Sequence, residues 1–113
     1  MNSGLQAERW AVQHLQQQGL KLVVQNYRSR YGEIDIIMQE ASILVFIEVR
    51  LRRNVNFGGA AASIDARKQR RIIRTAQQFL NSLSHTPPCR FDAVLIDTQN
   101  EQVQWLKNAF DAN

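Results

Sequence analysis

The spacing of apolar positions along the chain predicts two helices. Over residues 3–18, apolar side chains recur at the three- and four-residue spacing of a helix, and Gly19 is a favourable stop. Over residues 63–83, Ile72 and Phe79 belong to a second stripe of this kind. Proline cannot continue a helix, so the proline pair at 87–88 limits this second element. Each helix therefore has one apolar face with which it can cover a sheet.

Five strands are predicted between and after these helices. The segment Gly32–Gln39 alternates, and we expect one face to carry Ile34, Ile36 and Met38 and the other Glu33, Asp35 and Ile37. The segment Ile43–Arg50 is almost wholly apolar, which is typical of a strand buried on both faces. The remaining strands are expected at Leu20–Asn26, Phe91–Ile96 and Val103–Leu106, with a glycine-containing loop at 54–62.

The order α-β-β-β-α-β-β predicts a single α/β domain over residues 1–113, with a mixed sheet flanked by helices. A chain of 113 residues that is 44% hydrophobic can bury one core. No apolar run approaches the roughly 20 residues of a membrane span, and the N-terminus lacks the features of a signal peptide. Cys89 is the only cysteine, which excludes an intrachain disulfide and a cysteine zinc cluster. The default expectation is a cytoplasmic protein with no membrane partner.

Two carboxylates on neighbouring strands are the first candidates for chemistry. If Ala41-Ser42 is a two-residue hairpin loop, the register places Asp35 opposite Glu48. Opposed side chains in a hairpin have Cβ atoms about 4.5–5.5 Å apart, and like charges at that spacing are destabilising. An ionised glutamate inside an apolar strand also carries a large desolvation cost. A hard divalent cation would offset both effects, and the alternatives are a raised pKa on one acid or a buried arginine partner.

A third acid and a neighbouring arginine extend this pattern. Glu8 lies in the middle of the apolar stripe of the first helix, where it needs a partner in the interior unless it is partly exposed or paired with an arginine. Three such acids in one small domain favour a shared metal ion. Arg50 follows Glu48 by two residues and projects from the same strand face, either to neutralise Glu48 or to hold a phosphate oxygen. Glu33 shares a strand face with Asp35 and could be a further ligand or support one, but a pair with Arg28 or Arg30 is favoured.

The charge of the chain is concentrated in one region. Between Arg50 and Arg74 stand eight basic residues and one acid, a net of +7, which leaves −3 for the rest. This concentration indicates a polyanionic partner, although a solvated helix face has the same appearance. The expected contacts with a nucleic-acid backbone are Arg52, Arg53, Arg67, Arg70, Arg71 and Arg74. Lys68 lies near the apolar stripe of the second helix, so it could reach an acid or a substrate phosphate, or extend to water.

Several motifs together resemble the small bacterial YraN-type proteins. These are G-x-x-x-E from Gly4 to Glu8, NYRSRYGEIDII, LVFIEVR, FGGAAASIDARKQRRI and CRFDAVLI. The motif order is similar to that of archaeal Holliday-junction resolvases and the wider restriction-endonuclease-like group with its PD-(D/E)xK motif. The resemblance implies a restriction-endonuclease-like core and metal-dependent cleavage of DNA. It also implies that Glu8 is the helix acid, Asp35 the first motif acid and Glu48 the second.

The first hypothesis is an enzyme whose site residues have defined roles. Mg²⁺ or Mn²⁺ would be held by Asp35, Glu48 and the carbonyl of Val49, with Glu8 bound directly or through water. Arg50 stands where the nuclease pattern has a lysine, and arginine does not lose its proton. Arg50 or Lys68 would stabilise the transition state. Action on a two-fold DNA junction would suit a homodimer.

Two other readings of the sequence remain open. One is a nucleic-acid-binding module of the same fold that has lost efficient cleavage, as the arginine at position 50 suggests. The other is a protein-interaction domain whose acids are each paired with an arginine. Binding to nucleic acid that weakens with salt would argue against the interaction domain, because contacts with phosphate are salt-dependent.

Overall fold

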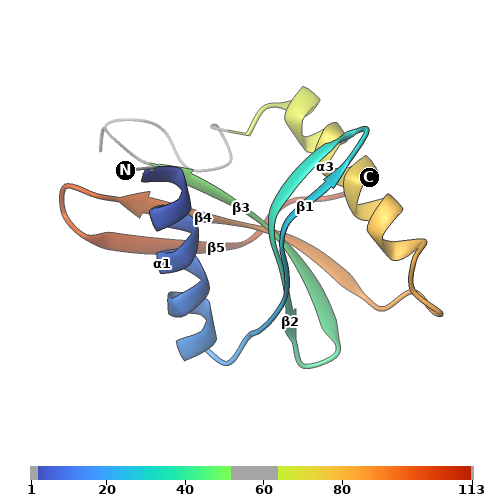
Figure 1. Ribbon diagram of the computed structural model, residues 1–113, viewed down its shortest axis with the longest axis horizontal. Helices are drawn as coiled ribbons and strands as arrows, with labels where there is room; N and C mark the ends of the chain where they lie inside the picture. The colour runs from blue at the N-terminus through green and yellow to red at the C-terminus, as the bar shows by residue number, and fades with distance from the viewer. Residues whose placement is uncertain (1–2, 52–63, 113) are drawn as a thin grey trace.

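The computed structural model describes residues 3–51 and 64–112, with the order of elements that the sequence predicts (Figure 1). Its elements are α1 (Ser3–Gln17), β1 (Lys21–Ser29), β2 (Gly32–Glu40), β3 (Ile43–Leu51), α3 (Ala66–Leu80), β4 (Cys89–Asp97) and β5 (Gln102–Phe110). The strands form one sheet in the order β1-β2-β3-β4-β5. Only β3 and β4 are parallel, so the sheet is mixed. None of the described helices has the length and apolar character that a bilayer crossing requires.

The two helices cover opposite faces of the sheet and create two apolar clusters. In β3, Leu44 and Phe46 pack into the cluster under α3, whereas Val45 and Ile47 pack into the cluster under α1. All four side chains are buried, which confirms the prediction of a strand covered on both faces. Burial on both faces explains why β3 has no polar residue before Glu48. The architecture is a compact α/β domain consistent with a restriction-endonuclease-like core.

Several predicted boundaries shift for local physical reasons. Leu20 is not the start of β1, because its N–H donates to the carbonyl of Leu15 and its side chain is buried. The second helix begins after Asp65, whose carboxylate accepts a hydrogen bond from the Lys68 N–H at 2.8 Å. That helix ends at Leu80 rather than at residue 83. Ser63, where the helix was predicted to begin, and the predicted loop 54–62 lie outside the described residues.

The predicted alternation along β2 is wrong at one end. Ile36 and Met38 pack under α1 as expected, but Ile34 packs under α3 together with Ile37. The change of face coincides with an irregularity in the neighbouring strand. Asn26 has a positive φ of 55°, and it stands opposite Asp35 between the paired residues on either side. A left-handed residue within a strand twists the chain locally, so the strict two-residue period is lost.

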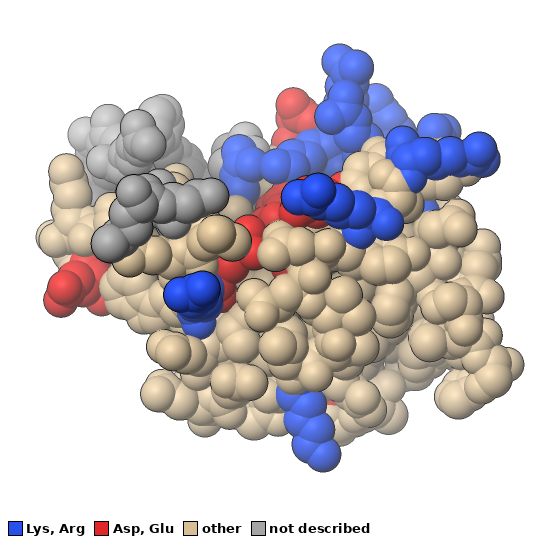
Figure 2. Space-filling model, in the orientation of Figure 1, with Lys and Arg blue, Asp and Glu red and all other residues tan. Residues whose placement is uncertain are grey.

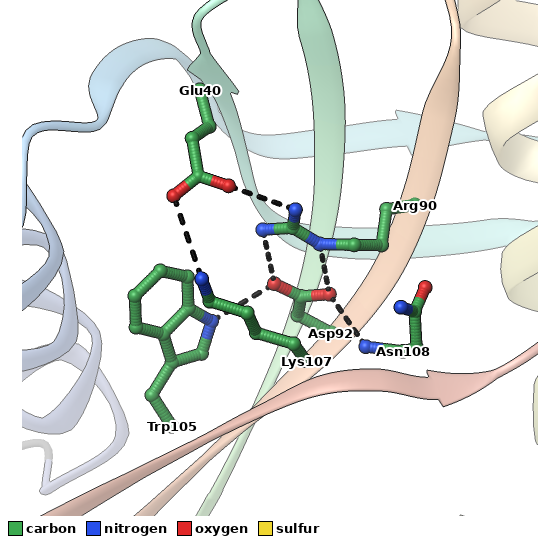
Figure 3. A network of polar contacts seen from close by, with 6 residues as sticks. All are labelled: Glu40, Arg90, Asp92, Trp105, Lys107 and Asn108. Atoms are coloured by element: carbon green, nitrogen blue, oxygen red, sulfur yellow. Dashed lines mark hydrogen bonds and ion pairs between the residues drawn. The ribbon is translucent and has the colours of Figure 1, made fainter.

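A buried polar network joins β4 to β5 and to the end of β2 (Figure 3). Asp92 is fully buried, and its two oxygens accept hydrogen bonds from the guanidinium of Arg90 at 2.9 and 3.0 Å. They also accept from Trp105 Nε1 at 2.9 Å and from the Asn108 N–H at 3.0 Å. Arg90 in turn donates to Glu40 at 2.8 Å. The predicted last strand, Val103–Leu106, therefore extends to Phe110, because Asp92 binds the backbone of the irregular part of β5.

Candidate active site

The strands β2 and β3 pair over only part of their length, and the candidate site lies where they separate. Their ladder runs from the pair Glu40–Ile43 to the pair Ile36–Ile47, which confirms the register predicted from a two-residue loop. The next positions in this register are Asp35 and Glu48. Here Asp35 no longer continues the ladder, and its Oδ2 accepts a hydrogen bond from the Val49 N–H at 2.8 Å. The separation of the strands opens a fork between them.

A cavity of about 270 Å³ occupies this fork. It is lined by Gly4, Ala7, Glu8, Asp35, Glu48, Val49, Arg50, Leu51 and Lys68. All six residues to which the sequence assigned catalytic or metal-binding roles are in this lining, and they come from α1, β2, β3 and α3. We call this space the acid cavity. The structure thus brings together side chains that are far apart in the sequence.

Asp35 and Glu48 form the electrostatic centre of the acid cavity. Burial raises the pKa of Asp35 to about 8, with further contributions from a hydrogen bond to Glu48 and from the charge of Glu48. The Val49 N–H and the charge of Lys68 act in the opposite direction and lower this pKa. The contributions that raise the pKa of Asp35 outweigh those that lower it, so the cavity favours the protonated form of this acid. A like-charge pair of this kind costs stability unless a cation or a proton separates the charges.

Glu8 approaches the same centre from α1. Burial raises the pKa of Glu8, the charge of Asp35 raises it further, and a hydrogen bond with the Asn26 side chain lowers it. One carboxylate oxygen of Glu8, Oε1, is buried and has no hydrogen-bond partner among the residues that the structure describes. A buried acceptor without a partner is costly, so this oxygen marks a place where a ligand would be stabilising.

Two cationic side chains border the acids. The Nζ atom of Lys68 lies 2.9 Å from Oε2 of the buried Glu48, and the contact is an ion pair rather than a well-aligned hydrogen bond. Lys68 itself is 41% exposed along its side chain, so it reaches from solvent into the cavity. Arg50 also lines the cavity. Of the alternatives that the sequence left for Lys68, the structure shows contact with an acid.

Loss of the lysine charge should expose the cost of burying Glu48. We expect Lys68→Met to lower the free energy of unfolding of the metal-free protein by about 1–3 kcal/mol, because the buried carboxylate then lacks its cation. Lys68→Arg keeps the charge and should lose less. Arg67→Met, one residue away on an exposed position of α3, is the matched control and should change stability by less than about 0.5 kcal/mol. Urea denaturation of the variants measures these differences, and equal losses at 67 and 68 would contradict the ion pair.

The donor set of the acid cavity fits a hard divalent cation. Among the described residues, no group of three or more His, Cys, Asp or Glu side chains is placed so that it could hold a metal ion. Mg²⁺ does not require three such side chains, because it keeps several waters and is commonly bound through one or two carboxylates. Such a cation would give the unpartnered oxygen of Glu8 a ligand and would offset the proximity of Asp35 to Glu48, which raises the pKa of Asp35.

Basic side chains of α3 lie beside these acids. Figure 2 shows Lys and Arg atoms gathered over the part of this face where α3 runs, with Asp and Glu atoms next to them toward the centre. The four arginines of α3 that the sequence singled out, Arg67, Arg70, Arg71 and Arg74, are all exposed. We call them the α3 arginines. The other two predicted contacts, Arg52 and Arg53, lie outside the described residues.

One residue of the site was missed by reasoning from the sequence. Asn26 bonds Glu8 through its side chain and has the positive φ that marks the irregularity of β1. Asparagine is uncommon inside strands and tolerates the left-handed region. Its position as the last residue of the predicted strand Leu20–Asn26 was therefore the available signal of an irregular backbone. By contrast, Glu33 forms the expected surface pair, with 3.2 Å between its Oε2 and Nε of Arg28.

The fold and the acid cavity define the class of protein, an α/β domain consistent with a restriction-endonuclease-like core. The profile described as "Uncharacterised protein family UPF0102" matches residues 7–96, and the chain belongs to this family, as the YraN-type resemblance indicated. The chain is 51% identical to a UPF0102 protein of Psychromonas ingrahamii, covering 96% of this chain and 89% of the relative. It is 54% identical to a UPF0102 protein of Nitrosomonas europaea, covering 97% and 94%. A UPF0102 protein of Pseudomonas fluorescens is 48% identical, covering 99% and 95%.

Proposed function

We propose that this protein is a metal-dependent endonuclease that hydrolyses phosphodiester bonds in DNA. The observation that carries the proposal is the meeting of three acids in the acid cavity. Glu8, Asp35 and Glu48 line it together, burial and Glu48 raise the pKa of Asp35 to about 8, and one oxygen of Glu8 is buried without a hydrogen-bond partner among the described residues. A small domain has no structural reason to collect three acids in one cavity, and strongly perturbed acids gather preferentially at functional sites.

Each residue of the cavity has a role in this proposal. Asp35, Glu48 and the carbonyl of Val49 would bind Mg²⁺ or Mn²⁺, and Glu8 would complete the site directly or through water. Such an ion, when bound, lowers the pKa of water and offsets the negative charge of a phosphate. Lys68 and Arg50 would stabilise the additional negative charge that develops on the phosphate during hydrolysis. Lys68 already reaches into the cavity, where its Nζ lies 2.9 Å from Oε2 of Glu48.

The α3 arginines support DNA as the substrate. They are exposed on the helix that also supplies Lys68, so a phosphate backbone lying along α3 would pass the acid cavity. Phosphate contacts release counterions, and binding then weakens with salt. If each of the four arginines contacts one phosphate, affinity should fall by about 100-fold between 50 and 200 mM salt. Fluorescence anisotropy with labelled DNA measures this, and affinity that is flat with salt would favour a protein-interaction domain instead.

Nicking of DNA tests the proposed activity directly. Purified protein is incubated with labelled junction, flap and duplex DNA in Mg²⁺, Mn²⁺, Ca²⁺ or EDTA. We expect nicking with Mg²⁺ or Mn²⁺ and none with EDTA, and the order of the three substrates gives the preferred structure. Nicking that persists in EDTA would rule out the proposed chemistry.

A second function is favoured by one specific feature of the cavity. Arg50 stands where the nuclease pattern has a lysine, and its delocalised guanidinium neither loses a proton nor matches the compact geometry of an ammonium group. The second candidate is therefore a DNA-binding module of the same fold with weak cleavage or none. Salt-dependent DNA binding without nicking in any metal would select this function over the first.

A further inference from the structure

A second cavity lies between the tip of the β1–β2 hairpin and the C-terminal half of α3. It has a volume of about 270 Å³ and is lined by Tyr31, Arg74, Gln77, Gln78 and Asn81. It shares no lining residue with the acid cavity. We call it the hairpin–helix cleft. Its lining combines one aromatic ring, one guanidinium and three side-chain amides, and it contains no carboxylate.

A chain of hydrogen bonds fixes the hairpin tip on α3. The Tyr31 N–H donates to Ser29 Oγ at 3.0 Å, and Ser29 Oγ donates to Thr75 Oγ1 at 3.4 Å. Thr75 is fully buried, and its hydroxyl donates to the carbonyl of Arg71 at 2.8 Å. The backbone of Tyr31 is thus tied through two hydroxyl groups to the middle of α3.

Close packing reinforces the same attachment. A Cβ atom at Gly32 would lie 3.5 Å from Thr75 Oγ1 and 3.6 Å from the Cβ of Arg71, and Gly32 has a φ of +153°. The hairpin tip therefore packs against Arg71 and Thr75 of α3 at Gly32. Arg30 contacts the tyrosine ring at the surface, because its Nη2 donates to the Tyr31 hydroxyl at 2.8 Å and its guanidinium carbon lies 5.0 Å from the ring centroid. Tyr31 thus has its backbone attached to α3 and its ring in contact with Arg30.

The chemistry of the cleft matches a nucleotide whose base is unpaired. An aromatic ring offers a surface on which a base can stack, and stacking of this kind tolerates every base. The amides of Gln77, Gln78 and Asn81 present both donors and acceptors, as the edges of bases do. Arg74, which is also one of the α3 arginines, can contact the adjacent phosphate. A base within a duplex could not enter, because its faces and its pairing edge are already occupied.

We propose that the hairpin–helix cleft binds one unpaired nucleotide of the DNA strand, an inference that rests on the proposed function for its choice of DNA. The cleft and the acid cavity lie along the same helix. The rise of about 1.5 Å per residue separates Lys68 from Gln78 by about 15 Å along α3. At about 3.4 Å per stacked nucleotide, this distance corresponds to roughly four nucleotides. The substrate class is therefore DNA with a single-stranded segment next to a duplex, such as a flap or a tailed end.

Binding measurements with tailed and blunt duplexes test the cleft without requiring cleavage. The full chain is titrated into labelled DNA in Ca²⁺ and in EDTA, and affinity is read by fluorescence anisotropy. Tyr31→Ala should weaken binding of the tailed duplex by about 5- to 20-fold and of the blunt duplex by less than 2-fold. Tyr31→Phe keeps the stacking surface and should keep most of the affinity. Equal losses on both substrates, or a loss on neither, would overturn the proposal.

Two matched variants separate base binding from charge. Arg67→Gln removes a charge at the other end of α3 and should weaken tailed and blunt duplexes to the same extent. Lys21→Gln removes an exposed charge at the opposite end of β1 and should change neither. Because Tyr31→Ala could alter the hairpin tip, Gln78→Ala serves as a second probe of the cleft. It is also expected to weaken the tailed duplex selectively, and a failure to do so counts against the cleft.

A fluorescent base locates the bound nucleotide. With 2-aminopurine placed at successive positions of the tail, one position should change its fluorescence on binding, and Tyr31→Ala should remove that change. No such position in the wild-type protein would overturn the proposal. If one tail position changes its fluorescence on binding but no DNA is nicked, the result would support the cleft and reject the endonuclease. Nicking together with equal binding of tailed and blunt DNA by the wild-type protein would reject the cleft alone.

Discussion

Asp35→Asn is expected to make the metal-free protein more stable and, at the same time, to remove its metal-dependent nicking of DNA. The asparagine side chain has nearly the shape of aspartate, and its amide oxygen can still accept the hydrogen bond from the Val49 N–H, which measures 2.8 Å in the structure. What the substitution removes is the negative charge that Asp35 acquires beside Glu48, in a buried place, when it loses its proton. The two effects have opposite signs, so simple misfolding cannot produce both.

The direction of the stability effect follows from the raised pKa of Asp35. The pKa is about 8 in the folded protein against an ordinary value of 3.8, so the folded state binds this proton more tightly than the unfolded chain does. Below about pH 4 both states hold the proton and Asp35 imposes no penalty. As the pH rises from about 4 toward 8, only the unfolded chain releases it, and the free energy of unfolding falls. Asparagine has no proton to release, so this fall is absent in the variant.

The difference between the two proteins should therefore grow with pH. We expect Asp35→Asn to be more stable than the wild type by about 2–4 kcal/mol at pH 8 in EDTA, and by much less at pH 4. Urea denaturation at several pH values measures the difference. Glu33→Gln is the matched control, since it removes an acid from the same strand that pairs with Arg28 at the surface. It should change stability by less than about 0.5 kcal/mol at either pH.

The metal response supplies the other half of the prediction. Mn²⁺ should raise the melting temperature of the wild type, and more so at pH 8 than at pH 5, because metal binding requires the acids to lose their protons. Asp35→Asn should lose this increment and lose nicking by more than about 100-fold, since even the outer partners of metal ligands typically contribute 10- to 100-fold. A variant that is less stable than the wild type in EDTA at pH 8, or that still responds to Mn²⁺, would contradict the assignment.

The meeting of Asp35 and Glu48 could be predicted from the sequence because a short hairpin leaves little freedom. A two-residue loop fixes the register, and the register fixes which side chains are opposed. Helical periodicity likewise placed Lys68 near the apolar stripe of its helix, but left open whether the lysine reaches an acid, a phosphate or water. These predictions depend on local geometry that repeats along an element, so they hold wherever the element is regular.

The prediction failed where the geometry stops repeating. Ile34 lies on the other face from Ile36 because Asn26 has a positive φ on the neighbouring strand, and no hydrophobic pattern encodes that backbone angle. The same irregularity brings the Asn26 side chain to Glu8. A site that depends on an irregular backbone is therefore only partly visible in a periodic pattern, and such irregularities are frequent near functional sites.

Two acids with the same sequence signal have different roles in the structure. Glu48 and Asp92 both interrupt an apolar strand, and both are buried. Asp92 accepts hydrogen bonds from Arg90, Trp105 and the backbone of Asn108, so it needs no further ligand. Glu48 has an ion pair with Lys68 and a hydrogen bond with the second acid Asp35. Sequence alone shows that a buried acid needs a partner, but the partner comes from distant elements and is known only once the chain is folded.

Asp92→Ala is accordingly expected to destabilise the protein by about 3–5 kcal/mol, since one partner of a buried ion pair is removed and the other stays buried. The side chain of Arg90 is only 11% exposed, and Trp105 Nε1 and the Asn108 N–H would lose their acceptor as well (Figure 3). Urea denaturation in EDTA measures the loss. Asp111→Ala, an exposed acid just beyond β5, is the control and should cost less than about 0.5 kcal/mol.

A double variant distinguishes the loss of the hydrogen bonds to Asp92 from the cost of leaving the charge of Arg90 buried without a partner. Arg90→Leu combined with Asp92→Ala removes both charges, and replacement of a buried pair by apolar groups is often close to neutral. The double variant should therefore be more stable than Asp92→Ala alone, even though it also gives up the contact of Arg90 with Glu40 at 2.8 Å. None of these residues lines the acid cavity, so the folded double variant should keep the Mn²⁺ response. A double variant less stable than the single one would contradict the cost of an unpaired Arg90, because it would mean that Arg90 stabilises the protein even without Asp92, through its contact with Glu40. Loss of the Mn²⁺ response would mean that the network also shapes the site.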